Sequence, residues 1–164
     1  MKAKSSADTL LGHALPHYIP ASIVLYLQHP VAADHNRLTE KRLTIMKLPG
    51  PDHPITITAN PKRVRVTVDG AVIADTTHAL TLKEASYPAV QYVPRGDANM
   101  ALLQRTERTT HCPYKGDASY FSIKADGKTL ENSIWTYETP FPAMAEIAGH
   151  LAFYPDKVKI EEVA

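Results

Sequence analysis

Residues 110–120 carry the densest group of reactive side chains in this chain, reading Thr-His-Cys-Pro-Tyr-Lys-Gly-Asp-Ala-Ser-Tyr. The segment holds the only cysteine of the sequence together with a histidine, a lysine and an aspartate. Pro113 fixes its own backbone φ angle, whereas Gly116 permits conformations that other residues rarely adopt. This combination predicts a turn between two strands, where polar side chains can be held together. We therefore expect a binding or catalytic site here.

Cys112 is the candidate nucleophile of this segment. A thiol reacts as its thiolate, so a nearby cation or histidine would have to lower its pKa from about 8.5. His111 is adjacent, but neighbours on a strand point to opposite faces, and adjacency alone therefore does not make a nucleophile and base pair. The alternatives are a buried structural thiol for Cys112 and a hydrogen-bonded wall residue for His111.

Lys115 is a candidate anchor for an anion, because Gly116 lets a ligand approach the backbone closely. The upstream glycine and the hydroxyl residue after the lysine that define a P-loop are both missing, so no Walker-type site is predicted. The alternative is a structural ion pair with Asp117 or Glu107. Glu84, near the end of an expected strand, could join the same site as a base or pair with Lys115.

A second loop and an aromatic strand add further candidates. Arg95 lies in a turn rich in proline and glycine, where its forked guanidinium could bind a carboxylate or phosphate, or pair with Asp97. Trp135 and Tyr137 are two residues apart and share one strand face, so they could wall a pocket or belong to the core. Tyr114, beside the lysine, completes the expected pocket.

Composition excludes several classes of protein. The chain has 164 residues, enough for one domain with a core, and 18 basic against 17 acidic residues give a formal charge of +1. This balance argues against a strongly basic nucleic-acid surface. A single cysteine excludes an intramolecular disulfide framework and a multi-cysteine zinc site. The histidines of the first 35 residues match no ligand spacing, so no metal is predicted and the cofactor is unknown.

Alternating apolar residues predict a mainly β domain. The valines at 64, 66 and 68 alternate with polar residues, as in a half-buried strand. Asp69-Gly70 then predicts a two-residue hairpin turn, with residues 71–74 returning as the partner strand. Further strands are expected at residues 81–84, 89–93, 121–124, 128–135, 151–154 and 158–160. One short helix is expected from Pro142 to the residue before Gly149.

The first 45 residues lack this alternation. We expect them to form a loosely attached arm, with a partly ordered segment or an upstream start as alternatives, and place the domain at residues 46–164. Residues 52–61 contain several breaks and are expected to be a loop leading into the domain. The apolar residues 21–27 fall short of the roughly 20 that a membrane helix needs. Since the N-terminus also matches a secretory signal poorly, we expect a cytoplasmic protein.

Several motifs occur in an order and spacing that indicate a known family. They are Arg63-Val64-Arg65-Val66, Gly70 with Ala74-Asp75-Thr76, Glu84 with Tyr87-Pro88, Tyr92-Val93-Pro94-Arg95 with Asp97, Thr110 with Cys112-Pro113-Tyr114-Lys115-Gly116, Ala118-Ser119-Tyr120, Trp135 with Tyr137, and Leu151-Ala152-Phe153-Tyr154. The stretch from about residue 63 to 158 resembles the domain of unknown function 427 (DUF427) family, which is also labelled a nucleotidyltransferase domain.

This resemblance implies a compact bent sheet or an open β-barrel with the Cys-Pro-Tyr-Lys-Gly segment at its heart. It implies no established reaction. Many nucleotidyltransferases hold a metal-bound triphosphate with Gly-Ser followed by paired aspartates, and this chain lacks that pattern. We therefore give the nucleotidyltransferase label little weight.

The residues and the resemblance together predict a domain that binds a small anionic or nucleotide-like ligand. The expected ligand-binding residues are Arg95, Lys115, Tyr114, Trp135 and Tyr137. The alternative is a group-transfer or thiol-dependent enzyme that uses the same pocket. Its candidate catalytic residues are Cys112, His111, Glu84 and Asp97. A protein-interaction module is the second alternative, and the oligomeric state is not predicted.

Overall fold

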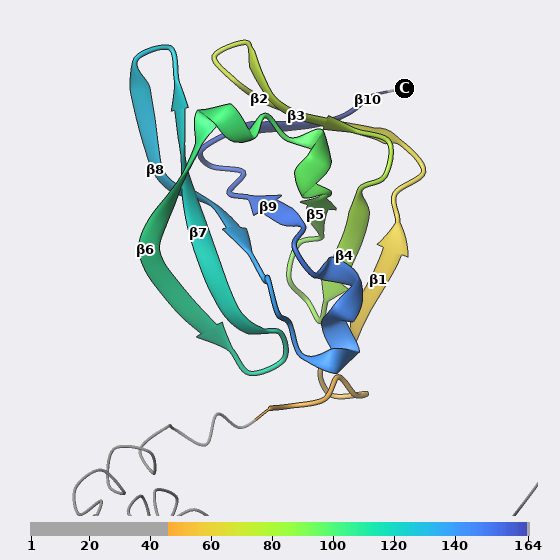
Figure 1. Ribbon diagram of the computed structural model, residues 1–164. Coiled ribbons are helices and arrows are strands. Elements are labelled where there is room, and N and C mark those ends of the chain that lie inside the picture. Colours follow the sequence, from red (N-terminus) through yellow and green to blue (C-terminus); the bar gives the residue numbers. More distant parts are fainter. Residues whose placement is uncertain (1–45, 164) are drawn as a thin grey trace, which may run out of the picture. The chain divides into compact units, whose positions relative to one another are not determined.

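The computed structural model describes residues 46–163, which form a mainly β domain (Figure 1). The strands are β1 (Ile55–Ala59), β2 (Arg63–Val68), β3 (Ala71–Thr76), β4 (Leu80–Glu84), β5 (Val90–Val93), β6 (Leu103–Cys112), β7 (Gly116–Ala125), β8 (Lys128–Thr136), β9 (Leu151–Phe153) and β10 (Lys159–Val163). The 3-10 helices are η2 (Arg95–Asp97), η3 (Met100–Leu102) and η4 (Pro142–Ile147). The predicted fold class is confirmed.

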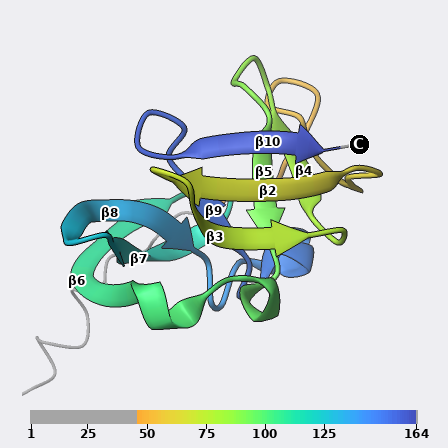
Figure 2. The same cartoon turned by 90° about the horizontal axis from the view of Figure 1, so that it is seen from above.

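The strands make two antiparallel sheets, and neither closes into a barrel. The larger sheet has seven strands in the order β1-β4-β5-β9-β8-β7-β6, and the smaller has three in the order β10-β2-β3. The small sheet lies across one end of the large one, as the view from above shows (Figure 2). The fold is therefore an open, bent arrangement, as the family resemblance implied.

Both hairpins predicted from Asp-Gly turns are present. Asp69 and Gly70 have φ angles of 47° and 91° between β2 and β3, and Asp126 and Gly127 have 50° and 74° between β7 and β8. Positive φ at both central residues is what a type I′ turn requires, and its twist matches that of the flanking strands. These turns fix the register of the two hairpins.

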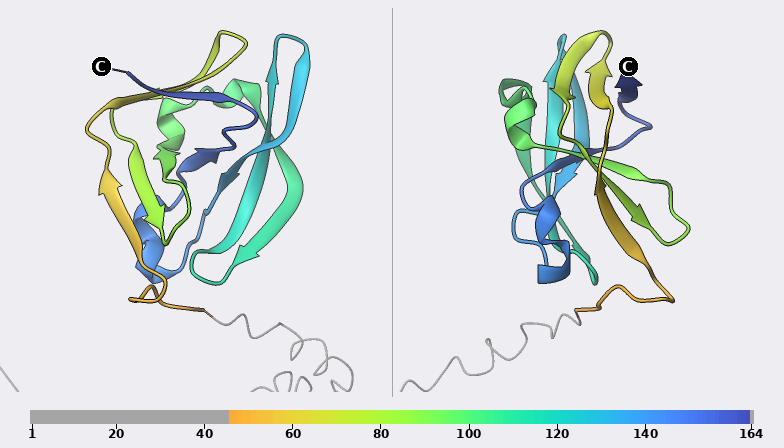
Figure 3. Two further views of the ribbon diagram at one scale, coloured as in Figure 1. Left: turned by 180° about the vertical axis from the view of Figure 1, so that it is seen from behind. Right: turned by 90° about the vertical axis from the view of Figure 1, so that its right-hand side faces the viewer.

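Register shifts bend the long strands of the large sheet. The pairing of β6 with β7 shifts between Arg105 and Thr109, and that of β7 with β8 between Phe121 and Ile123. Such bulges bend a strand and increase its twist. The curvature of β6 and β7 is visible in the views from behind and from the side (Figure 3). It turns the β6–β7 end of the sheet toward β4.

The expected loop at residues 52–61 is wrong for its central part, which forms β1. Ile55, Thr56, Ile57 and Thr58 are β-branched, and β1 pairs with β4 from Ile55 opposite Glu84 to Ala59 opposite Leu80. The prolines that suggested a loop lie outside the strand. β-Branched residues pack well on a pleated surface, so pairing with β4 decides the local structure.

The sequence implied a strand before the turn at Cys112 but gave no range for it, and this strand is β6. It has ten residues, pairs only with β7 at the edge of the sheet, and most of its side chains are exposed. A strand that faces water carries polar residues on both faces, and its sequence therefore shows no hydrophobic alternation. Pairing with β7, rather than a hydrophobic pattern in its own sequence, therefore determines that β6 is a strand.

The predicted helix near the C-terminus is confirmed in place and is a 3-10 helix. Pro142 lies in its first turn, and Met144 and Ile147 are its buried residues. Gly149, with a φ of 69°, follows where the sequence predicted the stop. None of the helices within residues 46–163 is long and apolar enough to cross a membrane. The predicted arm, residues 1–45, lies outside the described residues.

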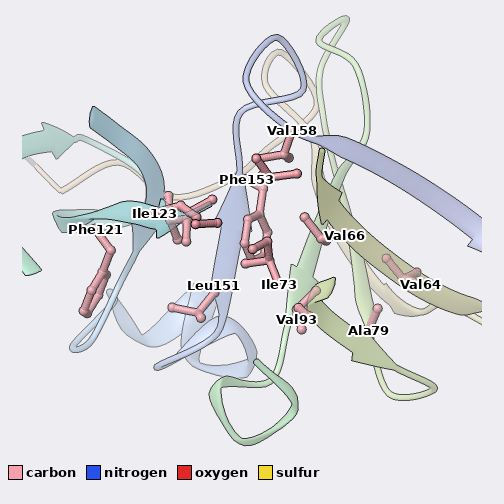
Figure 4. Close-up of a cluster of buried hydrophobic side chains, with 14 residues drawn as sticks. Val64, Val66, Ile73, Ala79, Val93, Phe121, Ile123, Leu151, Phe153 and Val158 are labelled. Carbon is pink, nitrogen blue, oxygen red and sulfur yellow. The ribbon is translucent and has the colours of Figure 1, made fainter. Parts of the chain in front are cut away.

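The main hydrophobic core lies between the two sheets. Val64, Val66 and Ile73 of the small sheet face Ile123 of β7 and Phe153 of β9, and all five are at most 2% exposed (Figure 4). The valines at 64, 66 and 68 were the first predicted core residues, and all three are buried. This core holds the small sheet against the large one.

Neighbouring residues of β3 offer a direct test of this core. Ile73→Ala should lower the free energy of unfolding by about 2–5 kcal/mol, because it removes a fully buried side chain and leaves a cavity. Val72→Ala, on the opposite face and 46% exposed, should change it by less than about 1 kcal/mol. Urea denaturation of both variants measures the difference, and equal losses would contradict the packing described.

Candidate functional site

A cavity of about 270 Å³ opens on the face of the large sheet that points away from the small sheet. Its lining residues are Leu82, Glu84, Val90, Tyr92, Lys115, Tyr120, Trp135, Tyr137 and Tyr154. Five of these nine side chains are aromatic, and two are charged. The cavity therefore combines apolar ring faces with one polar end.

The register of the sheet aligns the aromatic residues. Tyr120 of β7 pairs with Trp135 of β8, Trp135 with Ala152 of β9, and Ala152 with Tyr92 of β5. Residues paired across antiparallel strands point to the same face, so this row faces the cavity. Because Ala152 carries only a methyl group, the flanking rings meet across it. The rings of Tyr92 and Trp135 lie edge to face with centroids 6.5 Å apart, and Trp135 Nε1 donates a hydrogen bond to the Tyr92 hydroxyl at 3.4 Å.

The polar end of the cavity is an ion pair between distant parts of the chain. Lys115 Nζ, in the β6–β7 turn, donates to Glu84 Oε2 at the end of β4 at 2.5 Å. The other oxygen of Glu84 lies 2.9 Å from His53 Nε2. The Lys115 side chain is 8% exposed and that of Glu84 19%, so both charges are largely withdrawn from water. The structure thus selects Glu84, rather than Asp117 or Glu107, as the partner of Lys115.

The ionisation of this end follows from the pairing. Burial raises the pKa of Glu84, but the hydrogen bonds from Lys115 and His53 outweigh it and leave the pKa below its ordinary value. Burial raises the pKa of Tyr92 and of Tyr137 well above the ordinary value for a tyrosine. Glu84 is therefore a carboxylate at neutral pH, and Tyr92 and Tyr137 are neutral phenols.

Tyr114 and His53 form an outer layer beside the ion pair. Their rings are stacked, with centroids 4.0 Å apart and 7° between the planes. The backbone amide of Lys47 also donates to the Pro113 carbonyl at 2.8 Å. Tyr114 is not among the residues that line the cavity, and it holds His53 against Glu84 instead.

Cys112 and His111 point to opposite faces of β6, as the sequence indicated. Cys112 packs against the buried residues beside the cavity. His111 Nδ1 lies 2.6 Å from Asp117 Oδ1, and its ring lies edge to face with Phe141. Within residues 46–163, no side chain makes a hydrogen bond to Cys112. Gly116, with a φ of 103°, completes the turn beneath residues 139–141.

Arg95 and Asp97 do not reach the cavity. Arg95 donates to Glu138 at 3.2 Å and its guanidinium lies over the Phe121 ring, while Asp97 accepts a hydrogen bond from Thr76 at 2.6 Å. The alternative pairing of Arg95 with Asp97 is absent among the described residues. The structure thus brings Lys115, Glu84, Trp135 and Tyr137 together and leaves Arg95, Asp97, Tyr114, His111 and Cys112 outside the lining.

Arg95 belongs to a second cluster on the other side of β7. Arg105 holds Glu138 with two hydrogen bonds of 2.7 and 2.9 Å and also donates to Ser119 at 2.8 Å. The bonds from Arg105 lower the pKa of Glu138 to about 2, with Arg95 adding to the effect. Since Ser119 and Tyr120 are neighbours on a strand, the cluster and the cavity lie on opposite faces.

Several lining residues were missed from the sequence. These are Leu82, Val90, Tyr92, Tyr120 and Tyr154, together with His53 behind Glu84. Tyr92 and Tyr120 each lie in a motif that the sequence analysis quoted, but the pattern alone gave no reason to distinguish them from core residues. A second hollow of about 700 Å³, beside the β2–β3 turn and residues 155–160, contains no predicted site residue.

A comparison of the sequence with models of known protein families identifies the same part of the chain as the β domain. The family described as Domain of unknown function (DUF427) matches residues 56–164, about two thirds of the chain. The chain belongs to the DUF427 family. The match covers every residue that lines the cavity and begins just after His53. A comparison with curated proteins finds no similar sequence. The cavity is therefore a feature of a DUF427 domain, and no known activity comes with it.

Removing one partner of the ion pair at the end of the DUF427 cavity should strongly destabilise the fold. Lys115→Met should lower the free energy of unfolding by about 3 kcal/mol, because it leaves the Glu84 carboxylate buried without its cation. The double variant Lys115→Met with Glu84→Gln should recover part of that loss. Lys62→Met, at the exposed pair with Glu162, should lower it by about 1 kcal/mol or less. Urea unfolding curves compare the variants, and strictly additive losses would contradict the coupling.

Acid should weaken the fold through Glu138. Its pKa of about 2 in the folded state is lower than the ordinary 4.5, so its contribution is complete above pH of about 4.5 and is lost as pH falls toward 2. The stability of Glu138→Gln should therefore vary less with pH between about 4.5 and 2. Unfolding curves at several pH values test this. Glu146→Gln, which removes an exposed acid, is the control and should retain the wild-type dependence.

Proposed function

We propose that this domain binds a small anionic or nucleotide-like ligand in the aromatic cavity. The observation that supports this most is the combination of four tyrosines and a tryptophan with an ion pair in one cavity. Its volume of about 270 Å³ is near the lower end of the range of about 300–1,000 Å³ that is typical of small-molecule sites. A ligand with one planar ring suits this size.

The ring faces provide the apolar part of the proposed interaction. Trp135 and Tyr154 lie with centroids 4.7 Å apart and are the two half-buried aromatic residues of the lining, whereas Tyr92 is 1% exposed. A planar ligand can stack on such faces, and stacking of a nucleobase on an aromatic side chain contributes about 1–3 kcal/mol. Stacking tolerates different rings, so it supports binding without selecting one base.

The ion pair provides the polar part. An ammonium has three N–H donors, and within residues 46–163 Lys115 uses one of them, for Glu84. The carboxylate beside it accepts hydrogen bonds. A donor and an acceptor side by side match the polar edge of a nucleobase or a similar ring. Buried polar groups of this kind discriminate against ligand analogues that leave their hydrogen-bonding atoms without a partner.

The enzyme alternative has weaker support than binding. Cys112 does not line the cavity, and within the described part of the chain no side chain makes a hydrogen bond to it. No three His, Cys, Asp or Glu side chains among residues 46–163 are placed to hold a metal ion.

A single free cysteine is compatible with the reducing cytoplasm, which we propose as the location of the protein.

Trp135 is the only tryptophan of the chain, so its fluorescence reports on the cavity directly. Nucleosides, nucleotides and sugar phosphates should be screened for one that changes its emission saturably and raises the melting temperature. Glu84→Gln should weaken binding of such a compound about tenfold or more, because it replaces a charged acceptor at the polar end.

Arg95→Ala is the matched control for this screen, because it removes a charge on the other face of the sheet. It should retain the wild-type affinity. The proposal would be wrong if no compound of the panel changed Trp135 emission or the melting temperature, or if Arg95→Ala abolished binding while Glu84→Gln did not.

A further inference from the structure

The charges inside the cavity do not provide a site for a full anion. Lys115 is buried, and Glu84 neutralises it at 2.5 Å. Arg95, the other cation expected to bind the anion, pairs with Glu138 on the other face. A phosphate placed beside Lys115 would also lie close to the Glu84 carboxylate. The anionic group of the proposed ligand therefore needs another cation.

Two exposed cations lie on rings that line the cavity. The Arg108 guanidinium is 4.7 Å from the centroid of Tyr120, and Lys157 Nζ is 5.6 Å from the centroid of Tyr154. Within residues 46–163 neither forms a salt bridge, although Lys157 donates to the Glu131 carbonyl at 2.6 Å. Cation–π contacts hold both charges at the rings and leave them without a carboxylate partner.

Tyr154 is the lining ring that Lys157 contacts, and it interacts with Tyr120, the ring that Arg108 contacts. Burial and the neighbouring Tyr120 hydroxyl raise its pKa, and Arg108 is close enough to act in the opposite direction. Asp156 is the acid that acts on the same group. Arg108 lies over the ring of Tyr120 and Lys157 over the ring of half-buried Tyr154, and both of these rings line the cavity. Both cations are exposed, whereas the ion pair of Lys115 and Glu84 is largely buried, and we call the side where the two cations contact the lining rings the mouth of the cavity.

We propose that Arg108 and Lys157 form the phosphate site for a ligand in which a phosphate is joined to a planar ring. This inference rests on the proposed function and adds the orientation of the ligand. The ring enters the cavity and stacks on Trp135, with its polar edge toward Lys115 and Glu84. The phosphate stays at the mouth, where a guanidinium and an ammonium bind it and water still reaches it. Nucleoside monophosphates and other ring phosphates share this chemistry.

Matched pairs of ligands test the orientation in the full chain. Adenosine and uridine should be compared with their 5′-monophosphates, pyridoxal with its 5′-phosphate, and inorganic phosphate should be measured alone. Trp135 fluorescence and calorimetry give the affinities. For at least one pair, the phosphate form should bind about tenfold or more tightly than the form without phosphate. This ratio should fall as salt is added, because both cations are exposed. The pair that shows it identifies the ring class.

The double variant Arg108→Gln with Lys157→Gln should reduce that ratio to about one and leave the affinity for the ring alone unchanged. Lys124→Gln, which removes an exposed lysine of β7, should keep the wild-type ratio. A wild-type ratio near one for every pair whose ring binds would overturn the phosphate site and leave the proposed function intact. If no member of any pair binds, the proposed function fails as well. Tighter binding of a single-stranded oligonucleotide than of any monophosphate would overturn the small-ligand assignment.

Discussion

The ion pair between Lys115 and Glu84 joins the two ends of the bent sheet. In the order of the large sheet, β4 is separated from β7 by β5, β9 and β8, yet the β6–β7 turn contacts the end of β4 through this pair. His53 braces the carboxylate, and Tyr114 stacks on His53. Removing either of two largely buried charges would destabilise the fold, since the remaining charge would stay desolvated without a partner. The curvature that encloses the cavity is therefore tied to this contact.

One small residue determines how the aromatic wall is assembled. Ala152 is fully buried on the short strand β9, and its register neighbours are Tyr92 and Trp135. A larger side chain would separate the two rings and occupy space on the cavity face of the sheet. The other face of the same strand contributes Leu151 and Phe153 to the core between the sheets. β9 thus supports the core with one face and the cavity with the other, and this gives a three-residue strand a central role.

Strand β7 separates the two groups of charges in the same way. Tyr120 faces the cavity, where Arg108 covers its ring, while Ser119 and Phe121 face the cluster of Arg95, Arg105 and Glu138. Both arginines of the cluster donate to Glu138, and these bonds hold residues beyond the end of β8 against the sheet. The cations at the cavity mouth have no such acid among the described residues. This difference in pairing is why the proposed phosphate site involves Arg108 and Lys157.

The sequence determined the parts of this protein that depend on local chemistry. Alternating valines and Asp-Gly turns predicted the hairpins, Pro142 and Gly149 bounded the short helix, and the alternation of faces separated His111 from Cys112. Only the tertiary structure decided the partners: Lys115 pairs with Glu84 across three strands, Arg95 pairs with Glu138 on the opposite face, and exposed β6 exists through its pairing with β7. A periodic pattern shows which side of a strand is buried, but not which distant strand faces it, because the bulges and the register of the folded sheet bring those strands together.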